Sequence, residues 1–433
     1  MRNDLAECKL VDLWRDLISR EDTLVTENGE PLRVIYPGRL NDDRGADFRD
    51  AVIALGSLVQ QGDIELHVNS VDWDAHGHSQ DPVYNNVILH VVLQENGSLT
   101  MHRADGELLP TLSLHRYLEK RLQSAPSVLP CSGVAIRNSM KAADILEEAG
   151  EARFRQKAAQ FQEELTQTDA GQVLYRGILG ALGYSKNKIP CTELADLVPL
   201  SNLESIARKL PEEDGLRHRQ ALLFGVAGLL PSQRSGYPVH KNDIYTDTLE
   251  SLWSELYYRE SLPPGSWNLF KVRPLNSPLR RIAGLGYLVW RYRHRGLPVS
   301  LLDLITATPA EKVRELTGAF PVNSADYWAE HSDFGLKCSR LSSSLIGANR
   351  AGEIIINVLL PFVYNQDNLS RKAIEMFRHY PALPANSIEK HLQKQLGLSK
   401  NVVNYACRQQ GLIHIYKTLC TQGKCLECRL NNQ

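Results

Sequence analysis

Acidic residues and histidines are concentrated between residues 45 and 93. Polar and apolar residues alternate along residues 63–68, and a β-strand points alternate side chains to opposite faces. Asp63, Glu65 and His67 are therefore expected on one face of a strand, with the apolar residues between them buried on the other. Two carboxylates and an imidazole on one face can bind a divalent cation and activate a water molecule. An ordinary half-exposed strand with solvated acids is the alternative.

A further acid, Asp47, stands just before a second strand-like stretch. An acid at one strand, followed on the next strand by an acid two residues before a basic or imidazole residue, resembles the PD-(D/E)xK nuclease core. The resemblance implies that Asp47 and Glu65 bind the metal and that the Leu66 carbonyl adds a ligand. It places His67 where those enzymes have the lysine that positions the attacking water. Because a histidine is mostly neutral at pH 7, His67 can instead act as a ligand or a base.

Two further histidines, His76 and His78, lie in a polar stretch with glycine and proline residues, which predicts a surface loop beside the acid-bearing strand. Both are candidate metal ligands. Residues 87–93 form a nearly continuous apolar run, which predicts a strand buried on both faces. His90 interrupts this run, and a lone histidine in such a strand is more often a hydrogen-bonded core residue than a ligand.

Several motifs along the chain resemble the bacterial domain-of-unknown-function family numbered 2851. They lie at residues 45–48, 62–68, 72–73, 76–78, 81–92, 222–231, 273–276, 280–283 and 411–416. The resemblance spans nearly the whole chain and is most specific in the N-terminal block. It implies no particular activity.

Composition and charge narrow the class of protein. The 433 residues are enough for two or three domains at the usual size of about 150 residues each. The formal net charge of -1 gives no global basic field, so any contact with nucleic acid must come from a local patch. No apolar run is long enough to span a membrane, and the first residues lack the apolar core of a signal peptide. The cytoplasm is the expected location, without a membrane partner.

From about residue 138 the composition favours helices. Residues 141–149 and 153–161 are rich in good helix formers with apolar residues at helical spacing, and prolines then punctuate a series of shorter segments. The predicted architecture is an α/β N-terminal domain with a restriction-endonuclease-like mixed sheet, followed by a mostly α-helical region. The predicted boundaries are 1–130 for the α/β domain, 131–405 for the helical region and 406–433 for a cysteine-containing segment.

Three cysteines cluster near the C-terminus with the spacing Cys420-x4-Cys425-x2-Cys428. Such a short spacing lets a loop wrap a metal ion or cluster, and a closed zinc or iron–sulfur site needs a fourth ligand. Cys407 from the preceding helix and Cys131 from the end of the N-terminal domain are both candidates for this position. The alternative is that these are incidental thiols.

The basic residues concentrate around Arg273, Arg280 and Arg281, with aromatic residues nearby. Arginines interleaved with aromatic side chains can bind phosphates and stack on bases, so these three are the candidate nucleic-acid-binding residues. The alternative is a helix whose apolar side packs inward while arginines cover its solvent side. The sequence contains no P-loop, GxSxG elbow or Rossmann fingerprint, which disfavours nucleotide hydrolysis, serine-hydrolase chemistry and dinucleotide redox chemistry.

The hypothesis is a nuclease that uses Mg²⁺ or Mn²⁺ to hydrolyse phosphodiester bonds of nucleic acid. The candidate metal ligands are Asp47, Asp63, Glu65, His76 and His78. The predicted catalytic residues are Asp47, Glu65 and His67, with His67 orienting or deprotonating the attacking water. Mixed oxygen and imidazole ligands predict that Mn²⁺ binds better than Mg²⁺. The alternative is a catalytically inactive scaffold that binds nucleic acid or protein and keeps a structural metal or iron–sulfur site.

Overall fold

The structure is a computed structural model of the chain. It describes residues 2–19, 23–41, 43–96, 100–118, 131, 139–234, 243–256, 260–263, 265–269, 272, 276–338 and 343–431. The chain divides into two compact units, and neither is one continuous stretch of sequence. The sheet unit comprises residues 1–150, 385–403 and 411–433, and the helical unit comprises residues 151–384 and 404–410.

The sheet unit is built on a seven-stranded mixed sheet with the order β1-β2-β4-β5-β6-β9, in which β3 also pairs with β4. Its strands are β1 (Leu24–Val25), β2 (Pro31–Tyr36), β3 (Arg39–Leu40), β4 (Phe48–Leu55), β5 (Leu58–Asn69), β6 (Val87–Gln94) and β9 (Thr111–Ser113). Neighbours from β1 to β5 are antiparallel, whereas β5 pairs with β6 and β6 with β9 in parallel. The short strands β7 (Met101–His102) and β8 (Leu108–Leu109) form a separate antiparallel pair.

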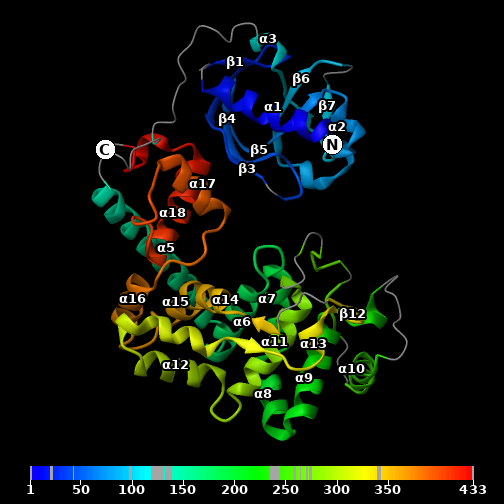
Figure 1. The fold of residues 1–433 in the computed structure, drawn as a ribbon, viewed down its shortest axis with the longest axis vertical. Coiled ribbons are helices and arrows are strands. Elements are labelled where there is room, and N and C mark those ends of the chain that lie inside the picture. The colour runs from blue at the N-terminus through cyan, green and yellow to red at the C-terminus, as the bar shows by residue number, and fades with distance from the viewer. Residues whose placement is uncertain are drawn as a thin grey trace. The chain divides into compact units, whose positions relative to one another are not determined.

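One face of this sheet is covered by helix α1 (Arg2–Ile18), which lies across the strands in Figure 1. Leu10 and Trp14 of α1 are buried in one apolar cluster with Ile64 and Leu66 of β5. Because side chains alternate along a strand, Glu65 and His67 must point to the other face. The alternation in the sequence therefore predicted the two faces of β5 correctly.

The parallel pairing of β5 and β6 requires a crossover, and this connection covers the polar side chains of β5. It consists of the short helix α2 (Asp72–Ala75) and two 3₁₀ turns, η1 (His78–Gln80) and η2 (Pro82–Tyr84). The surface loop predicted around His76 and His78 is thus largely helical, although its segments are each only a single turn.

A second apolar cluster joins Tyr36 of β2 and Val52 of β4 to helices from distant parts of the sequence. These are α5 (Ser139–Leu165), α17 (Ser387–Leu396) and α18 (Ala406–Thr418). Helix α17 has clear end signals: Asn386 and Glu389 form a capping box, and Gly397 follows in the left-handed conformation with φ 66°. A single-turn helix, α3 (His115–Leu118), follows β9.

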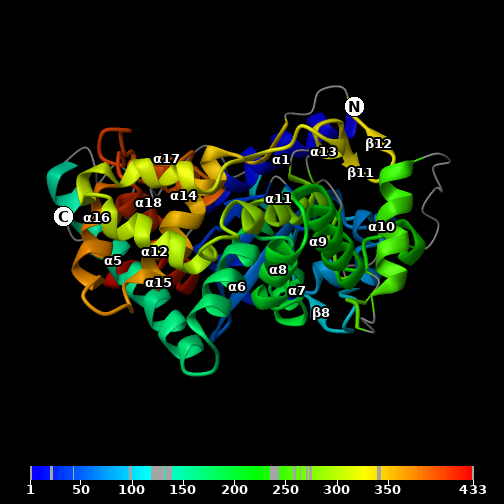
Figure 2. The same cartoon turned by 90° about the horizontal axis from the view of Figure 1, so that it is seen from below.

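The helical unit contains one large apolar core. Its helices are α6 (Ala170–Leu182), α7 (Lys188–Leu197), α8 (Leu200–Lys209), α9 (Glu212–Val226), η3 (Pro231–Gln233), α10 (Ile244–Glu255), α11 (Pro278–Arg291), α12 (Leu297–Ala307), η5 (Ala310–Ala319), α13 (Tyr327–Glu330), α14 (Ala348–Ile354), η6 (Ile355–Leu359), α15 (Leu360–Val363) and α16 (Ser370–His379). Its short strands are β10 (Val322–Asn323), β11 (His331–Asp333), β12 (Leu336–Lys337) and β13 (Ser344–Ile346). Helices α8 and α9 each begin directly after a proline, as the sequence predicted, and they pack against α11 (Figure 2).

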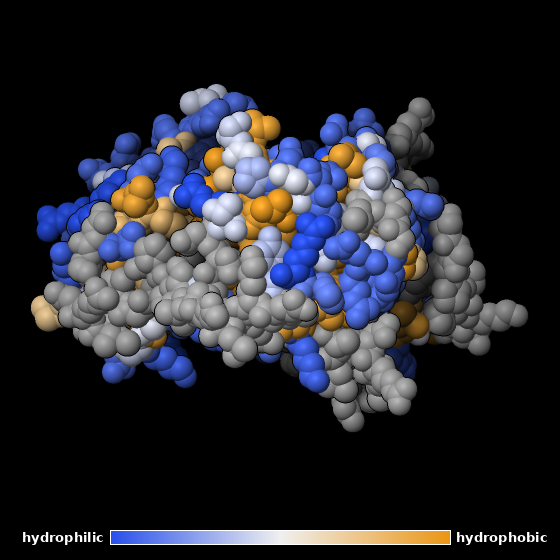
Figure 3. Space-filling view, turned by 90° about the horizontal axis from the view of Figure 1, so that it is seen from above, coloured by the Kyte–Doolittle hydropathy of each residue, from blue (hydrophilic) through white to orange (hydrophobic). Residues whose placement is uncertain are grey.

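The predicted fold class, an N-terminal α/β domain followed by a mostly helical region, is confirmed. None of the helices in the described part of the chain is long and apolar enough to cross a bilayer. On the face seen in Figure 3, hydrophilic residues cover much of the coloured surface, and hydrophobic residues lie in small groups between them. Single exposed apolar groups of this kind are normal on protein surfaces.

Candidate metal centre

Asp47 and Glu65 are fixed beside each other where β4 begins to pair with β5. The Asp47 backbone N–H donates to Glu65 Oε2 at 3.0 Å, and the Leu66 N–H donates to Asp47 Oδ2 at 3.0 Å. The Glu65 carboxylate is therefore held by the Asp47 backbone amide, and the Asp47 carboxylate is held by the Leu66 backbone amide. Sequence reasoning paired these two acids, and the structure brings them together.

Glu65 also faces a cluster of imidazoles. Glu65 Oε1 lies 3.3 Å from His78 Nε2 and 3.6 Å from His67 Nε2. His76 Nδ1 lies 3.2 Å from His67 Nε2. One ligand nitrogen from each of these three histidines lies within 4.8 Å of the others. The structure thus brings His78 to the acid on β5 and His76 to the neighbouring His67.

His90 on β6 contacts His67 on the adjacent strand β5. His67 Nδ1 lies 2.9 Å from His90 Nε2, and both side chains are buried. If His67 Nε2 is to bind a metal, its proton must sit on Nδ1 and be donated to His90 Nε2. The His90 proton then resides on Nδ1, which is buried without a hydrogen-bond partner among the described residues. In that arrangement His90 acts as a positioning residue, because its Nε2 accepts the Nδ1 proton of His67.

Aromatic side chains of the crossover pack against the histidine cluster. The Tyr84 ring stacks on His78 with ring centroids 3.7 Å apart, and Trp73 packs edge-on against His78 at 5.3 Å. Trp73 also lies 5.4 Å from the His90 ring. Sequence reasoning missed Tyr84 and gave Trp73 no role in the site. The signal was present, since both flank the His76–His78 pair in the same short segment.

The environment keeps the buried imidazoles uncharged. Burial and three neighbouring imidazoles lower the pKa of His67 to about 2. Burial and the nearby His78 lower the pKa of His90 to about 3. Burial also lowers the pKa of His78, against the opposite influence of nearby carboxylates. Neutral imidazole is the form that binds metal ions, so His67 and His78 can act as ligands at neutral pH without first losing a proton.

The site is not the solvated strand face that was the alternative. The exposed fractions are 1% for Asp63, 6% for Glu65 and 2% for His67. An acid buried to this extent must be paired or hydrogen-bonded, because an isolated buried charge is strongly disfavoured.

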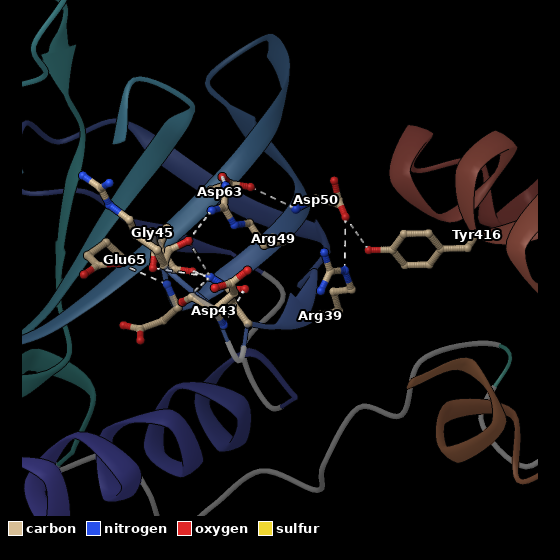
Figure 4. Close-up of polar contacts among 12 residues, drawn as sticks. Arg39, Asp43, Gly45, Arg49, Asp50, Asp63, Glu65 and Tyr416 are labelled. Carbon is tan, nitrogen blue, oxygen red and sulfur yellow. Dashed lines mark hydrogen bonds and ion pairs between the residues drawn. The ribbon is translucent and has the colours of Figure 1, made fainter. Parts of the chain in front are cut away.

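Asp63 does not join the histidine cluster, in contrast to the prediction that it assists in holding a metal. Arg49 Nη1 donates to Asp63 Oδ2 at 2.6 Å, and the Asp50 N–H donates to Asp63 Oδ1 at 3.1 Å (Figure 4). The β4–β5 register shifts between Phe48 and Ala51, and Asp50 within this bulge has φ 61°. Both Asp63 oxygens are engaged and Arg49 neutralises the charge, so we remove Asp63 from the candidate ligands.

Two glycines of the sequence motifs have a steric explanation. Gly45 has φ 97°, and a Cβ there would lie 2.3 Å from Arg49 Nη2, which donates to the Arg44 carbonyl at 2.8 Å. A Cβ on Gly62 would lie 2.4 Å from the Asn86 carbonyl oxygen. The first glycine makes room for the arginine that holds Asp63, and the second permits the close approach of the segment that leads into β6.

The predicted nucleic-acid-binding arginines occupy a different environment from the one expected. Arg280 and Arg281 have exposed fractions of 0% and 6%, so they cover no solvent-facing side of α11. Arg280 donates to the carbonyls of Trp328 and His331. Because buried guanidinium groups that hold the chain's own carbonyls are not available to phosphates, we do not assign these two arginines to an interface. Arg273 lies outside the described residues.

The two candidates for a fourth cysteine ligand are separated by the structure. Cys131 lines one pocket of the sheet unit together with Cys420, Cys425 and Cys428. Cys407 is instead buried in the apolar core of the helical unit.

Fold and geometry together define a mixed-sheet unit with a candidate metal centre of three imidazoles next to the Glu65 carboxylate, in a chain that also has a helical unit. The chain belongs to the DUF2851 family, described as a protein of unknown function, which it matches over residues 7–387. The match includes every residue of the acid–histidine site and ends before the cysteine trio. Searches among curated proteins and among solved structures found no match. The predicted family is thus confirmed, while the resemblance to the PD-(D/E)xK nuclease core stays a prediction.

Proposed function

We propose that the sheet unit is a divalent-metal-dependent hydrolase that cleaves phosphodiester bonds of nucleic acid. The observation that carries this proposal is the convergence of Glu65 Oε1 with the imidazole nitrogens of His67 and His78, at 3.6 and 3.3 Å. The Tyr84 ring stacks on His78 beside them. Ring nitrogens in the appropriate tautomer and a carboxylate oxygen can each offer a lone pair to a cation.

The spacing of these atoms suits direct coordination. Metal–ligand bonds of about 2.0–2.1 Å in a tetrahedral site place neighbouring ligand atoms about 3.4 Å apart. The separations in the structure are 3.2 Å for His76–His67, 3.3 Å for Glu65–His78 and 3.6 Å for Glu65–His67. One ligand nitrogen each of His67, His76 and His78 lies within 4.8 Å of the others, so one ion could contact these three imidazoles and keep a fourth position open for water, with Glu65 beside it.

The ligand chemistry favours a transition-metal ion. Imidazole nitrogen is a poor ligand for Mg²⁺, which prefers an octahedron of oxygen atoms, whereas Mn²⁺ and Zn²⁺ accept mixed nitrogen and oxygen ligands. With three imidazoles and one carboxylate, the site should prefer Mn²⁺ to Mg²⁺. The lowered pKa of His67 removes proton competition at neutral pH for any metal ion that this imidazole binds.

Asp47 supplies the second carboxylate that the reaction needs. Its Oδ2 is held by the Leu66 N–H, and its charge is close enough to His78 to act on the pKa of that ring. A divalent ion held by the imidazoles would lower the pKa of a water that it binds. Asp47 would then be the carboxylate that orients this water or accepts its proton. The order Asp47, then Glu65 and His67 on the next strand, is what supports a phosphodiester as the substrate.

The test compares metal-stripped protein, reloaded with Mn²⁺ or Mg²⁺, on labelled single- and double-stranded DNA and RNA. We expect cleavage with Mn²⁺ that is lost in Glu65→Gln, which keeps the acceptor for the Asp47 N–H and removes only the charge. Glu107→Gln is the matched control, because Glu107 is an exposed residue of the same unit. Calorimetric titration should show Mn²⁺ binding by wild type and weakened binding by the Glu65 variant.

The scaffold alternative gives a different set of results. A scaffold would cleave no substrate with any metal, and Glu65→Gln would be silent. Cleavage that persists undiminished in Glu65→Gln would come from another site or another protein, and would end the nuclease proposal. His67→Lys separates the two roles of His67: partial activity places it in the lysine position of a nuclease, whereas loss of metal makes it an obligatory ligand.

A further inference from the structure

Four cysteine thiols line a single pocket of the sheet unit, well separated in sequence from the acid–histidine site. The cysteine pocket is lined by Cys131, Cys420, Cys425 and Cys428 together with Tyr36, Gln395, Leu419 and Asn431. None of the four cysteines forms a disulfide. Four unpaired thiols that line one pocket are candidate ligands of a shared metal ion or cluster, because thiolates bind zinc and iron–sulfur clusters.

The backbone around the trio is folded so that the three thiols converge. Cys420 begins the 3₁₀ turn η7 (Cys420–Gln422) and Cys425 begins the turn η8 (Cys425–Glu427). Gly423 between them has φ 65°, and a Cβ there would lie 2.9 Å from Ile35 Cγ2. The Asn431 side chain donates to the Cys425 carbonyl at 3.1 Å. These contacts hold the turns against the sheet and close the loop around the pocket.

Cys131 completes the set from a distant part of the sequence. Gln395 Nε2 donates to Cys131 Sγ at 3.1 Å, which places this sulfur in the pocket. Cys131 thus lines the same pocket as Cys420, Cys425 and Cys428.

The spacing of the sulfurs favours a cluster over a single zinc ion. Tetrahedral zinc, with Zn–S bonds of about 2.3 Å, brings its sulfurs to about 3.8 Å from one another. Within the described ranges no three cysteine sulfurs lie within 4.8 Å of one another, a limit that the three imidazoles of the metal centre do meet. A cluster of iron and sulfide ions is larger than one ion and holds its four thiolates further apart.

We infer that Cys131, Cys420, Cys425 and Cys428 ligate a [4Fe–4S] cluster that ties the C-terminal turns to the segment carrying Cys131. The cluster sits against Tyr36 and Leu419 in a largely apolar pocket, an environment suited to a structural role. Cys407 is not a ligand. This site is separate from the metal centre of the proposed hydrolase and does not depend on it.

The test is iron, sulfide and zinc analysis of the full chain purified without oxygen, together with its visible absorbance before and after dithionite. We expect about four iron and four sulfide per chain, as a [4Fe–4S] cluster contains, and a brown colour that dithionite bleaches; about two of each would be a [2Fe–2S] cluster and would overturn the assignment. Wild-type protein that contains zinc instead, or no metal, overturns the inference.

Variants assign the ligands. Cys131→Ser and Cys425→Ser should each lose most of the iron, whereas Cys407→Ala and the control Cys338→Ser should keep it. Loss of iron in Cys407→Ala with retention in Cys131→Ser would overturn the choice of Cys131. If a ligand variant fails to fold, the metal content of wild type still decides whether a cluster is present.

Discussion

The buried imidazoles should make the metal-free protein sensitive to mild acid. The pKa of His67 is about 2 and that of His90 about 3, whereas an unfolded histidine titrates near 6.5. Because the folded values are lowered, the unfolded state takes up protons first as the pH falls. The stability that these histidines contribute is therefore fully present above pH 6.5 and is lost progressively below it.

The size of this loss between pH 7 and pH 5 follows from linkage. Over this interval an unfolded imidazole with a pKa of about 6.5 gains most of a proton, whereas the folded His67 and His90 stay neutral. At about 1.4 kcal/mol per pH unit, each histidine then lowers the free energy of unfolding by about 2 kcal/mol. The pair together should remove about 4 kcal/mol, which is a large share of the stability of an ordinary domain.

The assay is urea unfolding in EDTA at pH 7, 6 and 5, followed by tryptophan fluorescence. Trp73 packs against His78 and His90, so its emission reports on this part of the sheet unit. The double variant His67→Asn/His90→Asn should lose most of the pH dependence, while the exposed-residue control His102→Asn keeps it. An equally steep loss of stability in the double variant would refute the reasoning, because the acid sensitivity would then arise elsewhere.

Two further predictions concern arginines. Arg49→Gln leaves the Asp63 carboxylate without its cation and should lower the free energy of unfolding by about 2–3 kcal/mol. The loss is somewhat less than for a fully buried pair, because Arg49 is partly exposed. In a double-mutant cycle, adding Asp63→Asn should recover much of this loss, and simple additivity would contradict the pairing. Arg280→Ala should lower the free energy of unfolding by about 3 kcal/mol and leave the salt dependence of any nucleic-acid binding unchanged. A variant with full stability and a smaller salt dependence of binding would show that Arg280 contacts nucleic acid.

Local patterns predicted the strand β5 and the meeting of Glu65 and His67 on one of its faces, although not the separate position of Asp63. Alternation is a property of neighbouring residues, so Glu65 and His67 could be placed from sequence, and the short distance to His76 and His78 made their approach foreseeable. The burial of this face could not be foreseen, because it depends on how the crossover folds back over β5. The ion pair of Arg49 with Asp63 also escaped prediction, since it arises from the bulge around Asp50.

Contacts between residues far apart in the sequence could not be predicted from local patterns. Cys131 and Cys407 were equally acceptable partners for the cysteine trio in sequence, and only the tertiary fold places Cys131 in the pocket. Arg280 and Arg281 carry charge in a helix, a pattern that normally indicates a solvent-facing side. Their burial is set by nearby carbonyl groups of α13, β11 and β13, which a helical pattern does not reveal.

The sheet unit is formed by three separate stretches of the sequence, which affects when it can fold during synthesis. Tyr36 and Val52 share an apolar cluster with Leu412, Tyr416 and Leu430. The ribosome must therefore complete the whole stretch 151–384 before the residues that cover this side of β2 and β4 emerge. Until then the nascent sheet carries an uncovered apolar surface, and its final closure waits on contacts of very large sequence separation, the kind that slows folding. A cluster held by the last turns and by Cys131 would act at this late step, locking the sheet unit after the helical unit has already formed.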